Sequence, residues 1–362
     1  MRAPANLKPL TALRIFAALW VVLFDYWPNL GLPTPMIVAK GYLGVELFFT
    51  LSGFILCHVY LRQVEEGRFQ YGSFLWTRLA RIYPLHLAAI AGIALMGAAA
   101  MALGHPVDAN AVSLRALPAN LLLINAWGFA PVSGWNHASW SISAEWLAYL
   151  LFPAFAFAAL KLKDRPRLAI GLAVAFLTGL YAVFSRLTGQ SLTHATIAWG
   201  ALRIVPCFAF GCAAYLAWRA NLVRSSAAAW VGAAISGAAL ITFAQFGSPD
   251  AAIVTASGGL ILSLAFVAKT WTTGRILDGF VYLGEISYSV YMLFVPWQLL
   301  FVNVTSRALH YDKDHMPIYI WLVFVVSIIP LAALSHHLIE RPARDLMRRG
   351  LPRFERPFAT VA

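Results

Sequence analysis

Near its start the chain reads LTALRIFAALWVVLFDYW, from Leu10 to Trp27. This run is long enough to span a bilayer, yet it contains Arg14 and Asp25, and charges inside a membrane segment are costly and seldom face lipid. The two residues are separated by about three helical turns, so they share one helix face about 16 Å apart. We expect this face to line a polar interior. Alternatively, Arg14 is anchored at lipid phosphates, and Asp25 is buried and paired with a neighbour.

The composition of the whole chain indicates a membrane protein. Of its 362 residues, 60% are hydrophobic and only 12% are charged, whereas a soluble domain carries about 25% charged residues. We predict an all-α, polytopic membrane helical bundle. The net charge of +12 reflects basic cytoplasmic loops, and no nucleic-acid partner is expected. The cysteines match neither a disulfide framework nor a metal site and are interpreted as core residues: Cys57, Cys207 and Cys212.

Ten apolar runs are predicted to be membrane spans. Both termini are placed in the cytoplasm, because this orientation puts most of the 27 lysines and arginines on the cytoplasmic side. We predict one transmembrane domain over residues 1–345 and a basic cytoplasmic tail over 346–362. The predicted spans are 10–30, 41–61, 83–103, 143–161, 168–186, 200–218, 227–246, 251–268, 280–301 and 317–338.

A pair of arginines lies in the predicted cytoplasmic loop 62–82. Arg78 and Arg81 are three positions apart, so on a helix they project from one side. Two guanidinium groups aimed together suit a phosphate-rich ligand such as coenzyme A or a lipid headgroup. Ordinary anchoring of a cytoplasmic loop is the alternative. Pro84, just beyond the pair, suits the start of the third span.

The predicted outer loop ends in SGWNHASWSISAEW, residues 133–146. Aromatic rings, hydroxyls and a carboxylate are the groups that bind sugars, because rings stack on the C–H faces of pyranoses and carboxylates accept their hydroxyl hydrogen bonds. This pattern favours Trp140, Ser143 and Glu145 as acceptor or catalytic residues. An interfacial tryptophan belt is the alternative, but Glu145 argues against it because apolar residues follow directly.

The second predicted span carries a polar stripe. Glu46, Thr50 and Gly53 fall on one helix face, and Gly53 would allow close approach of another helix. Residues 168–275 are interpreted as scaffold, with Arg203 and His194 as exceptions near the outer surface.

Six motifs, in order, resemble those of the acyltransferase family 3 of membrane O-acyltransferases, and together they span nearly the whole chain. They are LRIFAAL (13–19), GVELFFTLSGF (44–54), RLARIYP (78–84), WSISAE (140–145), ISYSVY (286–291) and ERP (340–342). The resemblance implies transfer of an acyl group, usually acetyl, from cytoplasmic acyl-CoA to a hydroxyl of a saccharide or lipid-linked glycan. It also implies a multi-pass protein of the bacterial inner (cytoplasmic) membrane, with acyl-CoA as substrate and no bound cofactor.

Site residues are predicted from these motifs in three groups. The catalytic residues are Asp25, Arg14 and Glu145, the acceptor-binding residues are Glu46, Trp140, Ser143 and Tyr288, and the acyl-CoA-binding residues are Arg78, Arg81 and Ser52.

The sequence departs from the family pattern where the family has a histidine taken as catalytic. Asp25 stands at that position, and Phe294 stands where the ninth-span motif often continues to a histidine. Neutral imidazole suits a base acting on a hydroxyl, and an ordinary carboxylate is weaker, although burial brings its pKa nearer to neutral. Asp25 is therefore predicted to act as the base or to orient the acceptor hydroxyl. The histidines that would otherwise supply one are His58, His86, His137 and His336.

Two other functions remain open at this point. A catalytically impaired or engineered relative that only binds ligand would explain the loss of both histidines. A transporter of a lipid-linked sugar would also carry acids and arginines within its spans. The two halves of the sequence show no obvious repeat of spans, which many transporters have.

Overall fold

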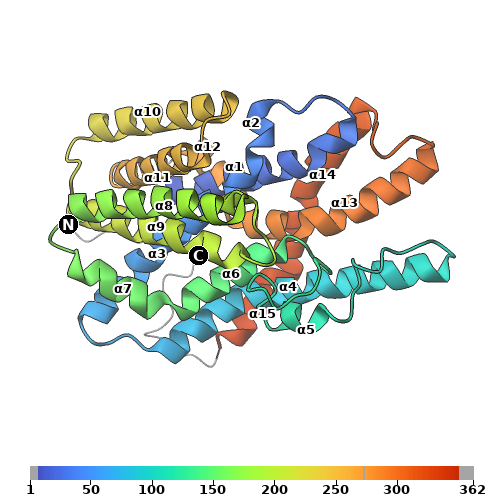
Figure 1. Cartoon of the computed structure of the whole chain (residues 1–362), viewed down its shortest axis with the longest axis horizontal. Coiled ribbons are helices and arrows are strands. Elements are labelled where there is room, and N and C mark those ends of the chain that lie inside the picture. The colour runs from blue at the N-terminus through green and yellow to red at the C-terminus, as the bar shows by residue number, and fades with distance from the viewer. Residues whose placement is uncertain (1–6, 272–273, 350–362) are drawn as a thin grey trace.

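A computed structural model describes residues 7–271 and 274–349. Long helices run along the molecule, and most connections lie at its two ends (Figure 1). No strand occurs within these ranges, in agreement with the predicted all-α class. The helices are α1 (Lys8–Tyr26), α2 (Met36–Ala39), α3 (Gly44–Glu65), α4 (Tyr71–Ala102), α5 (Leu117–Leu121), α6 (Ser139–Leu150), α7 (Phe152–Lys161), α8 (Pro166–Thr188), α9 (Gly200–Arg219), α10 (Ser226–Gln245), α11 (Asp250–Val267), α12 (Arg275–Glu285), α13 (Ser287–Leu309), α14 (Ile318–Ser335) and α15 (Arg341–Met347).

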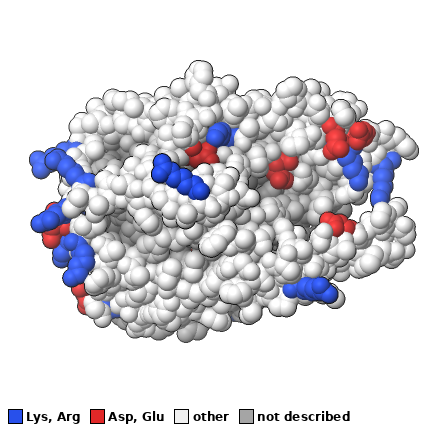
Figure 2. Space-filling model, in the orientation of Figure 1, with Lys and Arg blue, Asp and Glu red and all other residues white. Residues whose placement is uncertain are grey.

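The lengths and composition of these helices fit a multi-pass membrane protein. In the described part of the chain, nine helices are long and apolar enough to cross a membrane, and the count reaches ten if the bent pair α6 and α7 is one span. Figure 2 shows basic side chains gathered at the left end of the molecule, where Figure 1 places the α7–α8 and α9–α10 connections. Residues 350–362 of the predicted tail lie outside the described residues.

The predicted span over 143–161 is not one straight helix. The chain bends by 57° between α6 and α7. Pro153 lies in the first turn of α7, and because proline has no N–H and clashes with the preceding turn, a helix seldom continues through it unbroken. The bend leaves α6 as a short helix that presents Glu145 to the interior.

Two predicted span starts are also wrong. The third span begins at Tyr71 rather than at 83, so Arg78 and Arg81 lie inside α4 and Pro84 is within the helix instead of at its start. The ninth span is predicted to begin at residue 280, but α12 is a separate helix that ends at Glu285, and α13 begins at Ser287. A hydropathy pattern ends a span at charged residues. Arg78 and Arg81, however, face the protein interior and not lipid.

Two glycines set a very close crossing of α3 and α9. A Cβ on Gly53 of α3 would lie 2.2 Å from the Phe208 carbonyl oxygen, and a Cβ on Gly211 of α9 would lie 2.0 Å from the Thr50 carbonyl oxygen. Only glycine fits at both positions, because the two backbones touch. This confirms the close approach predicted at Gly53. It also fixes α3, which supplies one wall of the site described below.

Candidate active site

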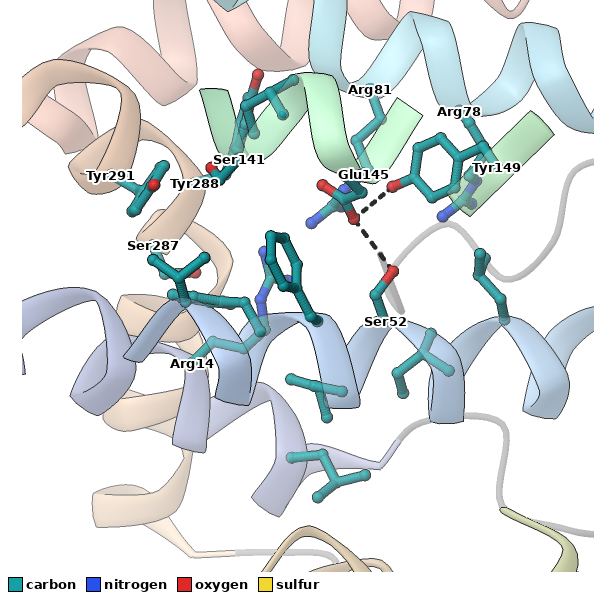
Figure 3. Close-up of a pocket in the computed structure, with 18 of the residues that line it drawn as sticks. Arg14, Ser52, Arg78, Arg81, Ser141, Glu145, Tyr149, Ser287, Tyr288 and Tyr291 are labelled. Atoms are coloured by element: carbon teal, nitrogen blue, oxygen red, sulfur yellow. Dashed lines mark hydrogen bonds between the residues drawn. The ribbon is translucent and has the colours of Figure 1, made fainter. Parts of the chain in front are cut away.

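A pocket lies between α1, α3, α4, α6 and α13 (Figure 3). Each of these helices projects at least one polar side chain into it, and convergent polar groups in a concave site are typical of ligand binding. The helices come from both halves of the sequence, so the pocket is formed only by the folded chain. The predicted site residues that line it are Arg14, Ser52, Arg78, Arg81, Glu145 and Tyr288.

Three arginines dominate the charge of this pocket. Arg78 is buried, and Arg14 and Arg81 are half-buried. Among residues 7–271 and 274–349, no carboxylate lies within ion-pair distance of any of the three. The Arg78 guanidinium lies instead near the rings of Tyr60 and Tyr149, 5.7 and 6.0 Å from their centroids. Burying unpaired charge is unfavourable, so the pocket is suited to an anionic ligand.

Among the described residues that line the pocket, Glu145 is the one with a carboxylate. Its Oε1 accepts hydrogen bonds from the Ser52 hydroxyl at 3.1 Å and the Tyr149 hydroxyl at 2.5 Å (Figure 3). The Ser52 bond joins α3 to α6 across the pocket, whereas the Tyr149 bond lies within α6. Tyr149 is four residues after Glu145, so both project from one face of α6. The sequence carried this signal, but Tyr149 was not among the predicted site residues.

Asp25 lies outside the pocket lining, toward the end of α1. Its backbone oxygen accepts a hydrogen bond from Gln298 Nε2 at 3.2 Å. The half-buried carboxylate itself has no hydrogen bond or ion pair in the described ranges. The neighbouring Tyr26 ring lies 6.4 Å from that of Phe294, and the Phe294 ring lies 5.6 Å from that of Tyr291, which lines the pocket. Aromatic rings therefore connect the pocket to the residue beside Asp25.

Glu46 and Trp140 belong to a different cluster. Glu46 Oε1 accepts from Arg203 Nε at 2.7 Å and lies 2.6 Å from Arg203 Nη2, and the two side chains are only 0% and 2% exposed. The Arg203 guanidinium is 4.3 Å from the Trp140 ring centroid, and its Nη1 donates to the Ala195 oxygen at 2.9 Å. The structure gives these residues partners within the protein. Their predicted role in acceptor binding stays a prediction.

Ser143 is also placed away from the pocket lining. Its hydroxyl donates to the Leu123 oxygen at 2.8 Å and accepts from the Ala126 N–H at 3.1 Å. Leu123 has a positive φ of 57°, which is uncommon for a branched side chain. Ser143 thus holds the loop before α6 in its unusual conformation, and its acceptor-binding role remains a prediction.

The four alternative histidines make contacts elsewhere in the protein and do not line the pocket. His86 Nε2 is 2.9 Å from the Asn120 oxygen, and His137 Nδ1 is 2.5 Å from the Ser133 hydroxyl. His336 Nδ1 is 3.0 Å from Glu340 Oε2, which also accepts from the Ser289 hydroxyl at 2.8 Å. His58 packs edge-on against Trp218, with ring centroids 5.1 Å apart. The pocket lining in the described chain contains no histidine.

Sequence reasoning did not single out several hydroxyl groups in the pocket. Ser141, Ser287 and Tyr291 line it together with Tyr288, on the side away from Arg78 (Figure 3). Their signal is visible in retrospect, because each lies in a run of polar residues inside an otherwise apolar helix. These hydroxyls are donors and acceptors suited to orienting a polar group between α6 and α13.

Comparison with known proteins assigns the chain to a family. A family model described as an acyltransferase domain matches residues 8–337. Among curated proteins, the chain is 34% identical over 119 residues to "Protein 2 in picA locus" of Rhizobium radiobacter, covering 32% of this chain and 59% of that protein. It is 33% identical over 159 residues to the acyltransferase MdmB of Streptomyces mycarofaciens, covering 41% and 38%.

A longer alignment joins the chain to a peptidoglycan O-acetyltransferase. Identity to OatA of Listeria monocytogenes is 24% over 335 residues, which is 84% of this chain and 51% of that protein. The chain thus spans about half the length of the curated relatives that it matches. No solved structure matches it significantly. The family match over almost the whole described helical bundle shows that the chain belongs to the acyltransferase family 3.

Proposed function

We propose that this protein is a membrane O-acyltransferase that moves an acyl group, most simply acetyl, from acyl-CoA to a hydroxyl of a glycan. Family membership supports acyl transfer. The glycan acceptor is suggested by the printed function of the Listeria relative, a peptidoglycan O-acetyltransferase. The single observation that carries the donor is the set of three pocket arginines without carboxylate partners in the described chain.

The donor fits the pocket by the placement of charged and uncharged groups. Acyl-CoA carries a diphosphate and a 3′-phosphate at one end and an uncharged thioester at the other. Arg78 and Arg81 would bind phosphate oxygens through charge-assisted hydrogen bonds. The hydroxyls of Ser141 and Tyr291 would then lie near the uncharged acyl end.

Asp25 is proposed as the base. An acceptor hydroxyl oxygen attacks the thioester carbonyl carbon while the Asp25 carboxylate takes the hydroxyl proton. The C–S bond then breaks, and the thiolate of CoA receives that proton, so the products are the acyl ester and free CoA. Tyr291 lines the pocket, and Phe294 connects its ring to that of Tyr26, beside Asp25. The acyl end would therefore extend past these rings toward Asp25.

The test is release of free CoA thiol by the purified protein in detergent, given acetyl-CoA with and without a mixed glycan acceptor. Loss of a general base slows a reaction by about 100-fold or more, so Asp25→Asn is expected to lose acceptor-dependent release while Asp25→His retains it. Asp314→Asn, an exposed acid of the α13–α14 connection, is the matched control.

Three outcomes would argue against this mechanism or this function. Undiminished release by Asp25→Asn would remove Asp25 from the chemistry. Acetyl-CoA binding without release by the unaltered protein would favour a ligand-binding relative that has lost catalysis. Absence of both binding and release would contradict the proposed function and leave transport of a lipid-linked sugar as the better reading.

A further inference from the structure

The last helix packs against the beginning of α4. Trp76 Nε1 of α4 donates a hydrogen bond to the Met347 oxygen at the end of α15, at 2.8 Å. Arg348, the next residue, donates from Nη2 to the Thr77 oxygen of α4 at 3.3 Å. Thr77 immediately precedes Arg78, so a guanidinium from the C-terminal helix is held beside the predicted phosphate-binding pair.

Arg348 has no acidic partner to explain its position. The nearby Arg344 lies 3.5 Å from Glu340, but no ion pair of Arg348 occurs within the described residues. Burial, and then the charges of Arg78, Arg344 and Arg81, lower the pKa of Arg348 to about 10. The side chain therefore remains a cation at neutral pH, close to other cations.

Two arginines of this region have buried hydrogen-bond donors without partners among the described residues. The Nε atoms of Arg78 and Arg348 are both buried and have no hydrogen-bond partner in the part of the chain that the structure describes. Arg78 is only 4% exposed. Buried donors are normally satisfied, and arginine N–H groups match phosphate oxygens in geometry and charge. Two such groups, one on α4 and one directly after α15, suit a phosphate group.

We propose that Arg348, together with Arg78, binds the 3′-phosphate of the acyl-CoA donor; this assignment rests on the proposed function. Arg78 lines the pocket, whereas Arg348 lies outside the lining and contacts α4 at Thr77. The group that reaches Arg348 is therefore the one farthest from the thioester. In acyl-CoA that group is the 3′-phosphate of the nucleotide.

The experiment compares binding of acetyl-CoA and of 3′-dephospho-acetyl-CoA to the full chain in detergent. Arg348→Gln keeps an N–H donor for the Thr77 oxygen but loses the charge. Arg349→Gln, which alters the adjacent exposed arginine, is the matched control. Loss of a charge-assisted contact weakens binding by about tenfold or more. We expect that loss for acetyl-CoA alone with Arg348→Gln, so that the preference for the 3′-phosphate disappears, while Arg349→Gln retains it.

Two further arms make the result decisive. Adenosine 3′,5′-bisphosphate, which has no thioester, should bind the unaltered protein and lose affinity in Arg348→Gln even if acyl transfer is never observed, so failure of the proposed function and failure of this assignment can be told apart. Phosphatidic acid in mixed micelles tests the other source of a phosphate group. The assignment is overturned if Arg348→Gln weakens both acetyl thioesters equally, weakens neither, or affects phosphatidic acid but not the bisphosphate.

Discussion

Arg203 and the pocket arginines are the same residue type in the same bundle, but their surroundings differ. Arg203 is 2% exposed and has Glu46, a backbone oxygen and the Trp140 ring as partners. Arg78 is 4% exposed and has no carboxylate partner in the described chain. A buried arginine with a carboxylate partner is part of the architecture, and one without such a partner is available to an anionic ligand. Pairing, rather than burial, separates the two roles.

The largest expected effect comes from breaking the paired region. Glu46→Gln leaves the Arg203 charge buried without a counter-charge, which costs about 3–5 kcal/mol of stability. The measurement is unfolding of the detergent-solubilised protein by SDS. The double variant Glu46→Leu, Arg203→Met should recover most of the loss, because neither charge remains. Equal stability of the single variant and the unaltered protein would mean that the pair is not structural.

The next effect is the reverse behaviour at Arg78. Arg78→Met removes an unpaired buried charge, so stability should stay the same or rise, while acetyl-CoA affinity should fall about tenfold to 100-fold. Binding by calorimetry and unfolding by SDS would be measured on the same preparation. Arg68→Met, in the exposed turn before α4, is the control. Unaltered acetyl-CoA affinity would refute the donor role of Arg78, and a large loss of stability would place it with Arg203.

The smallest effect is expected at Glu145, the carboxylate that partly offsets the pocket arginines. Glu145→Gln makes the pocket more positive, so donor affinity should be kept or increase. Turnover should fall about tenfold because the Ser52 and Tyr149 hydroxyls lose a charged acceptor. Steady-state kinetics with Glu285→Gln as control would separate kcat from KM. Normal turnover would reduce Glu145 to a residue that packs α6 against α3.

Much of the fold follows from the sequence, because apolar runs of membrane length have few alternatives. Gly53 was also predictable, since a small residue in a polar stripe indicates close helix contact. The start of α4 was not, because hydropathy treats Arg78 and Arg81 as loop residues whether they face water or an interior pocket. The 57° bend at α7 depends on Pro153, whose effect is hidden within one continuous apolar run.

The candidate site was predicted only in part, because a sequence shows the spacing of neighbouring residues but not their distant partners. Spacing placed Arg78 and Arg81 together, and both line the pocket. Glu46 looks the same as Glu145 in sequence, since both are acids in apolar helices. Only the fold brings Arg203, 157 positions away along the chain, against Glu46. A partner so distant in sequence leaves no local pattern, so the paired and unpaired roles could not be separated before the structure.

The π-helical turn at His336–Glu340 between α14 and α15 has a consequence for how this region can change. A π turn holds one residue more than an α turn, so every side chain after it is rotated by about 100° relative to an uninterrupted helix. That rotation sets the phase at which Arg348 meets α4. Deletion of a single residue here would turn Arg348 away from Arg78, although Arg348 itself would be unchanged. This segment should therefore tolerate substitutions better than single-residue deletions.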